Sequence, residues 1–165
     1  MSFDAYMKVD GVEGETTAKG HEKEIEILSF SFGASNPSSV GPGTTGIAAS
    51  RVQISSFSIM KRTDKTSPIL FQKCCAGKHL KEIVVTMLKA SGDSGQAPFL
   101  KYTFTDCMVD DIQWSATPNG EDYPGESLSF AFAKVAVEYQ QQATAGGAVG
   151  QPVVAEWDLT TVAGA

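Results

Sequence analysis

The stretch EIEILSFSFG at residues 24–33 gives the clearest indication of the fold. Its apolar and polar residues alternate, which is typical of a β-strand with one buried face, because successive side chains of a strand point to opposite faces. The alternation changes phase between Ile27 and Leu28. This change predicts a bulge or bend at that point in the strand.

The second half of this stretch predicts which side chains are buried. Leu28, Phe30 and Phe32 are expected to face the interior, because exposing three large apolar side chains would forgo several kcal/mol of hydrophobic stabilisation. Ser29 and Ser31 are then expected to point outward.

Strand-like patterns recur along the rest of the chain. They occur at residues 5–9, 52–60, 83–88, 99–109, 112–115, 128–139 and 153–159. Turn residues such as Pro118-Asn119-Gly120 and Pro124-Gly125 separate several of them, as between antiparallel neighbours. The sequence therefore predicts about eight strands and a mainly β barrel or sandwich.

One helix is predicted, at about residues 67–76. Ser67 is the expected N-cap, Pro68 suits the first helical position, and Gly77 suits the C-terminal cap. Within the helix, an apolar stripe is expected to pack against a sheet. Its members are Leu70, Phe71, Cys74 and Cys75.

Residues 35–50 form a Gly-, Ser-, Pro- and Thr-rich segment without hydrophobic periodicity. At about 16 residues it is longer than most loops, and long loops are often functional. We expect it to protrude from the domain.

Length and composition limit the class of protein. The chain has 165 residues and 42% hydrophobic residues, enough for one domain with a single core. No apolar run is long enough for a membrane helix or for the central segment of a secretory signal. The chain is therefore expected to be made in the cytosol, without membrane insertion, and to leave the cell, if at all, by another route.

Charge is unevenly distributed. Residues 1–50 carry a net charge of −4, residues 51–101 carry +6 and residues 102–165 carry −8, which gives −6 in all. The overall negative charge, with few aromatic residues among the lysines, disfavours nucleic acid as a partner. The division into segments of opposite sign would suit head-to-tail contact between copies, although an ordinary solvated surface explains it equally well.

The residues that could carry chemistry are few. Cys74, Cys75 and Cys107 cannot all pair within one chain, and a disulfide framework is not expected. No metal-ligand motif, phosphate-binding loop or cofactor motif is present, so no catalytic, cofactor-binding or metal-binding residue is predicted. Two alternatives stay open at this point: a cysteine hydrolase that uses Cys75 and His79, and a monomeric ligand-binding β-barrel.

The sequence as a whole resembles the haemolysin co-regulated protein (Hcp) family, the tube-forming components of bacterial type VI secretion systems. The resemblance covers almost the entire chain and departs at Glu156, where the family commonly has glycine before the tryptophan. It rests on GVEGE at residues 11–15, on His21, on the strand ending SFSFG at residues 29–33, on DKTSP at residues 64–68, on Cys74, on GKH at residues 77–79, on VEYQ at residues 137–140 and on Trp157-Asp158.

This resemblance implies a compact barrel of two antiparallel β-sheets with one flanking helix. It further implies homo-hexameric rings that stack into a tube, which a contractile sheath expels beneath a spike complex. Small secreted effectors would travel in the ring lumen, and spike, sheath and baseplate components would be the other partners.

The resemblance also suggests where the functional surfaces lie. Ser29 and Ser31 are the candidates for contact with effectors in the lumen. The candidates for contact between stacked rings are in the long loop: Ser39, Gly41, Pro42, Gly43, Thr44 and Gly46.

Overall fold

The computed structural model describes residues 3–39, 46–91, 95–120, 122–144 and 147–164. One helix, α1 (Ser67–Ala76), interrupts a series of strands. The strands are β1 (Phe3–Val9), β2 (Ile25–Glu26), β3 (Ser29–Ser31), β4 (Ala34–Ser35), β5 (Ser38–Ser39), β6 (Ala48–Ala49), β7 (Gln53–Ile54), β8 (Phe57–Arg62), β9 (His79–Ser91), β10 (Gly95–Ser115), β11 (Gly125–Tyr139), β12 (Val153–Asp158) and β13 (Ala163–Gly164).

Nine of the thirteen described strands form one antiparallel sheet, and β4 with β7 and β5 with β6 form two separate two-stranded sheets. The main order of the nine-stranded sheet is β13-β12-β11-β10-β9-β1-β2, and β3 and β8 join it through β11. The segments 99–109 and 112–115, expected as separate strands, are both part of β10, whose register shifts between Val109 and Asp111. The mainly β, antiparallel prediction is therefore confirmed.

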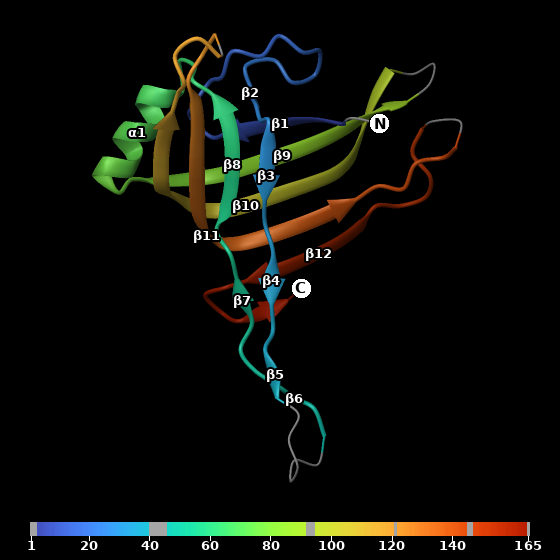
Figure 1. Cartoon of the computed structure of the whole chain (residues 1–165). Helices are drawn as coiled ribbons and strands as arrows, with labels where there is room; N and C mark the ends of the chain where they lie inside the picture. Colours follow the sequence, from blue (N-terminus) through green and yellow to red (C-terminus); the bar gives the residue numbers. More distant parts are fainter. Residues whose placement is uncertain (1–2, 40–45, 92–94, 121, 145–146, 165) are drawn as a thin grey trace.

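The two longest strands bend, so that one sheet forms two layers (Figure 1). The first part of β11 pairs with β8, from Gly125 to Phe130, and its last part pairs with β12, from Lys134 to Tyr139. The segment 25–31 joins the layers on the other side, because β2 pairs with β1 and β3 pairs with β8. The sheet thus wraps round a single core and gives the barrel-like shape.

Aromatic rings fill the centre of this core. Phe57 and Phe104 are fully buried, and their ring centroids lie 4.8 Å apart. Phe32 contacts both rings, and it also contacts Tyr102 at 5.5 Å. Phe30 and Phe32 therefore face the interior as predicted, both packed against the buried cluster.

Leu28 does not follow that prediction. Its side chain is 56% exposed, whereas Ile27 is buried. The chain changes partners here: the Ile27 amide donates to the Ala5 carbonyl of β1, and the Leu28 amide donates to the Met60 carbonyl of β8. The predicted phase change is real, but it lies between Leu28 and Ser29, which are both exposed.

Helix α1 has the predicted bounds, with two local differences. Thr66 is the N-cap and Ser67 the first helical residue, and the Ser67 hydroxyl donates to Glu126 of β11. Gly77 closes the helix in the left-handed conformation, as expected. Of the predicted stripe only Leu70 is fully buried; Phe71 is 47% exposed, and it contacts Trp114 with ring centroids 5.6 Å apart. Cys75 is also exposed.

The long segment 35–50 is more regular than expected. Its flanks form two short antiparallel ladders, β4 with β7 and β5 with β6. These continue the β3–β8 pair away from the domain, and Figure 1 shows them as one projecting arm. We call residues 33–39 and 46–55 the ladder. In the described part of the chain no helix is long and apolar enough to cross a membrane.

Candidate functional site: a serine-lined sheet face and a projecting ladder

Four strands, in the order β3, β8, β11 and β10, present one face to the outside. Phe57, Ile59, Leu128 and Phe130 point from β8 and β11 into the core, so the residues between them point outward. The strand register places these outward residues in rows across the four strands.

Serines dominate the rows. One row runs Ser31, Ser58, Ser129 and Asp111, and the next runs Ser29, Met60, Ser127 and Gln113. We call these eight residues the serine face. Ser58 and Ser129 share a hydrogen bond of 3.0 Å between their hydroxyl oxygens.

The serine face is mostly polar, with one exposed apolar side chain, Met60, and one exposed carboxylate, Asp111. Ser29 and Ser31 are exposed, and they lie on one strand as the sequence predicted. The Ser56 hydroxyl donates to Asp110 at 2.7 Å next to this face. Small hydroxyl side chains can exchange hydrogen bonds with a passing protein without offering it a large apolar or charged patch.

Sequence reasoning missed three of the five serines of this face: Ser58, Ser127 and Ser129. Ser127 and Ser129 alternate with Leu128 and Phe130, just as the two predicted serines alternate with phenylalanines. That alternation shows which way each serine points. It does not show which strands are neighbours, and the serines come together only through the pairing of neighbouring strands.

Two of the residues expected to contact a second ring, Ser39 and Gly46, lie in the ladder. Ser39 pairs with Ala48, and Gly46 is exposed with φ +135°. Gly41, Pro42, Gly43 and Thr44 fall outside the described residues. At the root of the ladder, the Gly33 amide donates to the Ser55 hydroxyl at 3.0 Å and the Ser55 amide donates to the Gly33 carbonyl at 2.9 Å.

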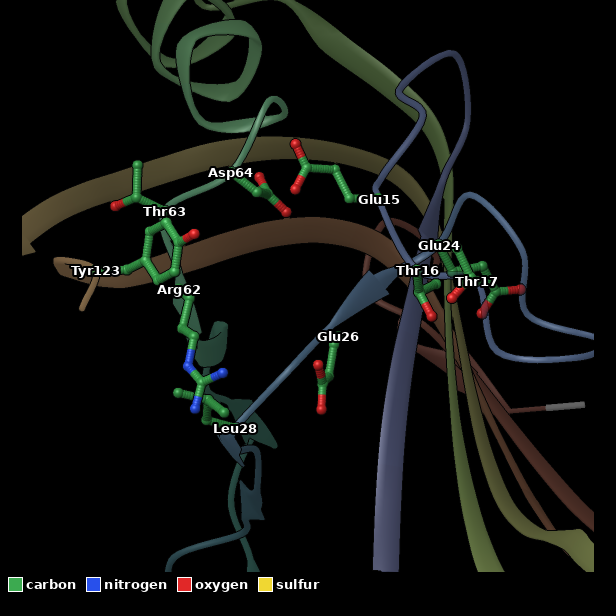
Figure 2. A pocket seen from close by; sticks show the side chains of 10 residues that line it. All are labelled: Glu15, Thr16, Thr17, Glu24, Glu26, Leu28, Arg62, Thr63, Asp64 and Tyr123. Carbon is green, nitrogen blue, oxygen red and sulfur yellow. The ribbon is translucent and has the colours of Figure 1, made fainter. Parts of the chain in front are cut away.

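A pocket of about 400 Å³ lies at the opposite end of β3 and β8 from the ladder (Figure 2). The residues that line it are mostly charged or hydroxylated: Glu15, Thr16, Thr17, Glu24, Glu26, Leu28, Arg62, Thr63, Asp64 and Tyr123. We call it the strand-end pocket.

Several carboxylates of the strand-end pocket already have partners. Glu24 contacts Nδ1 of His21 at 2.9 Å, and the imidazole stacks on Tyr6. Asp64 accepts Lys61 Nζ at 2.9 Å. Burial raises the pKa of Asp64, but the hydrogen bonds from Thr66 and Lys61 outweigh it, so the pKa lies below its ordinary value. These contacts hold the pocket wall in place.

The cysteine and histidine of the hydrolase alternative do not form a site. Cys75 and His79 are both exposed, and no hydrogen bond joins them in the part of the chain that the structure describes. Burial raises the pKa of the Cys107 thiol to about 12, which makes it a poor nucleophile. Among the described residues, no cluster of side chains could hold a metal ion.

Comparison with known proteins gives consistent matches. The family described as "Type VI secretion system effector, Hcp" matches residues 6–139. Protein hcp1 of Pseudomonas aeruginosa is 33% identical over 159 residues, which cover 96% of each chain.

Solved structures agree with these matches. A structure described as that of a type six secretion system protein superposes with a TM-score of 0.93 and 32% identity, over 99% of this chain and 100% of the other. Hcp1 from Salmonella typhimurium gives a TM-score of 0.80 and 29% identity, with both chains fully covered.

Proposed function

The chain belongs to the Hcp family of type VI secretion proteins, and from this membership we propose how its surfaces act. As a member of that family it is a secreted tube and effector-carrier protein of a type VI secretion system. The serine face, the open strand edges and the ladder each take a separate part of that work.

The serine face lines the lumen of a ring and is the surface that effectors meet. The observation that carries this proposal is the alignment of five serines, Ser29, Ser31, Ser58, Ser127 and Ser129, on adjacent strands of one outward face. A lumen wall must pass or hold a folded protein without trapping it, and a wall of small hydroxyl groups suits that task.

Six copies close into a ring through the open edges of this four-stranded layer. β3 pairs only with β8, and β10 beyond Met108 pairs only with β11, so each end of the layer has an unpaired edge in the described structure. Exposed backbone edges readily pair with another chain. Contact between two different edges is heterologous, and heterologous contacts give a ring when the rotation closes.

Phe71 and Trp114 support the same contact. Both are more than two-fifths exposed and lie beside the β10 edge, where a neighbouring copy would cover them. A covered pair of large aromatic rings is a common anchor of a protein interface.

Rings stack through the ladder into a tube, which the sheath, the baseplate and the spike complex move out of the cell with its effectors. The tube subunit carries no catalytic activity of its own. The separate, exposed positions of Cys75 and His79 support this last point.

Electron microscopy and native mass spectrometry of the purified full chain test the proposal. We expect particles of six subunits with a central channel, and raised salt is expected to weaken the contact if charge contributes to it. A monomer at micromolar concentration and low salt would contradict the assignment of the strand edges.

A further inference from the structure

We propose that the strand-end pocket receives the ladder of a second copy, in the next ring of the tube. This inference rests on the proposed stacking of rings and names the surface into which the ladder docks.

The strand-end pocket and the ladder lie at opposite ends of the same two strands. Leu28 lies immediately before β3 and Arg62 ends β8, and both line the strand-end pocket. At their other ends, the same two strands continue into the ladder. Figure 1 shows the arm extending from β3 and β8 away from the end that carries α1. A second copy displaced along this strand pair therefore brings its pocket to the ladder of the first.

The length of the ladder also fits this contact. An extended chain from Leu28 to Ser39 spans about 35 Å, at about 3.3 Å per residue. That length is close to the diameter of a small domain, which is about 30 Å. The end of the ladder thus lies about one domain away from its own pocket, which is the spacing that head-to-tail stacking requires.

The strand-end pocket offers charged and apolar groups to a docking segment. Arg62, Leu28 and Glu26 all line the pocket, and Figure 2 shows the carboxylate of Glu26 apart from the guanidinium of Arg62. Within the described residues, neither Arg62 nor Glu26 has an ion pair or a side-chain hydrogen bond. Leu28 and Tyr123 are 56% and 60% exposed at the rim. Four carboxylates and one guanidinium line the pocket, so its net charge is negative, and its rim adds apolar surface.

The ladder carries groups that match those of the pocket. Arg51 is the only charged residue between Gly33 and Ser55. Ile47 is 76% exposed, the highest value among the large hydrophobic residues described. A cation and an apolar side chain on the ladder complement the carboxylates and the apolar rim of the pocket, and such complementarity fixes the register of an interface. We infer that Arg51 pairs with Glu26 of the second copy, and that Ile47 packs on the rim at Leu28 and Tyr123.

Disulfide trapping tests the contact. The variant Ile47→Cys/Tyr123→Cys would be made in a chain that also carries Cys74→Ser and Cys75→Ser. The two new cysteines lie at opposite ends of the molecule and cannot pair within one copy. Oxidised tubes should therefore give a series of covalent oligomers on a non-reducing gel. The matched control, Ile47→Cys/Val153→Cys in the same chain, uses an exposed apolar residue of β12 and should stay monomeric.

A charge exchange gives an independent test. Arg51→Glu should abolish tubes in electron micrographs while native mass spectrometry still finds the ring. Arg51→Glu/Glu26→Arg should restore at least half of the tubes. Lys78→Glu makes the same change in net charge on an exposed residue outside the ladder, and should leave tube formation unchanged.

The results of these experiments distinguish the ladder–pocket contact from the stacking of rings itself. Tubes that form normally, with equal or greater cross-linking in the Val153 control, would overturn the assigned contact and leave ring stacking intact. The same holds if Arg51→Glu leaves the tubes unaffected. A wild-type chain that forms rings but no tubes would contradict stacking itself and would remove the inference with it.

Discussion

Lys61 and Glu126 face each other across β8 and β11, directly behind the serine face, and their Nζ and Oε1 atoms lie 3.3 Å apart with neither side chain exposed. Lys61 also donates to Asp64 at 2.9 Å and to the Ser67 hydroxyl at 3.0 Å. One buried ammonium group thus connects the sheet to the start of α1. Burial of an ion pair is costly unless each charge keeps its partner.

We therefore predict that breaking this pair on one side destabilises the domain strongly. Glu126→Leu leaves the Lys61 charge without its fully buried partner and should lower the free energy of unfolding by about 3–5 kcal/mol. Lys61→Met/Glu126→Leu, which removes both charges, should recover at least half of that loss. Chemical denaturation of the three proteins measures the difference. A double variant less stable than the single variant would show that the pair itself supplies net stability.

Acid should weaken the same region through Asp64. Its pKa is lower in the folded protein than in the unfolded chain, so its charge stabilises the fold above about pH 4. That contribution is lost as the pH falls through the lower, folded-state pKa. The wild type should therefore lose more free energy of unfolding between about pH 6 and pH 3 than Asp64→Asn does. Denaturant titrations at both pH values provide the comparison, and equal losses would contradict the role of Asp64.

Gly14 should tolerate no side chain. A Cβ atom at this position would lie 2.0 Å from the carbonyl oxygen of Glu24, which is backbone and cannot rotate away. Gly14→Ala should cost about 1–3 kcal/mol of unfolding free energy, as overpacking of an interior does. Gly33→Ala is the matched control, because nothing lies within 4 Å of the Cβ position there. If both variants melt at the same temperature, the two chain segments at Gly14 and Glu24 can separate freely.

The period of the sequence was sufficient to predict the strand type, the helix and the outward direction of Ser29 and Ser31. The prediction that Leu28 is buried was wrong, because a two-residue period holds only within one continuous strand. At Leu28 the chain stops pairing with β1 and begins to pair with β8. The Leu28 side chain therefore belongs to neither pair and lies at the rim of a pocket. A change of hydrogen-bonding partner depends on the tertiary structure, and the local alternation of residues cannot predict it.

The strand pairing within the ladder and the grouping of the five serines were missed for a related reason. Residues 34–39 and 48–54 have no hydrophobic alternation, and they pair because β3 and β8, which precede and follow them, are already neighbours. Likewise, Ser58 and Ser129 meet only through the register of β8 on β11. The family resemblance indicated the shape of the assembly, whereas these particular contacts depend on the three-dimensional arrangement of the strands.

Cys107 should resist modification in the native protein. Burial raises the pKa of its thiol to about 12, so almost no thiolate is present at neutral pH, and the side chain has no exposed surface. An alkylating reagent at about pH 8 should label the exposed Cys75 and leave Cys107 unmodified until denaturant is added. Peptide mass mapping before and after unfolding gives the result. Native labelling of Cys107 at a rate close to that of Cys75 would indicate that β9 and β10 open readily.

The serine face should be sensitive to added bulk at one position. Ser31 is exposed and lies opposite Ser58 in the register, so Ser31→Gln adds a long neutral side chain without disturbing the core. In the ring of six copies that we propose, with the serine face toward the lumen, the change is repeated around the whole lumen. Ring formation should persist while retention of a cognate effector falls about tenfold, which corresponds to about 1.4 kcal/mol. Thr161→Gln places the same side chain on an exposed turn near the C-terminus and should have no effect. Co-purification of effector with each ring measures retention. If Ser31→Gln rings hold as much effector as the wild type, effectors must contact a different surface of the ring.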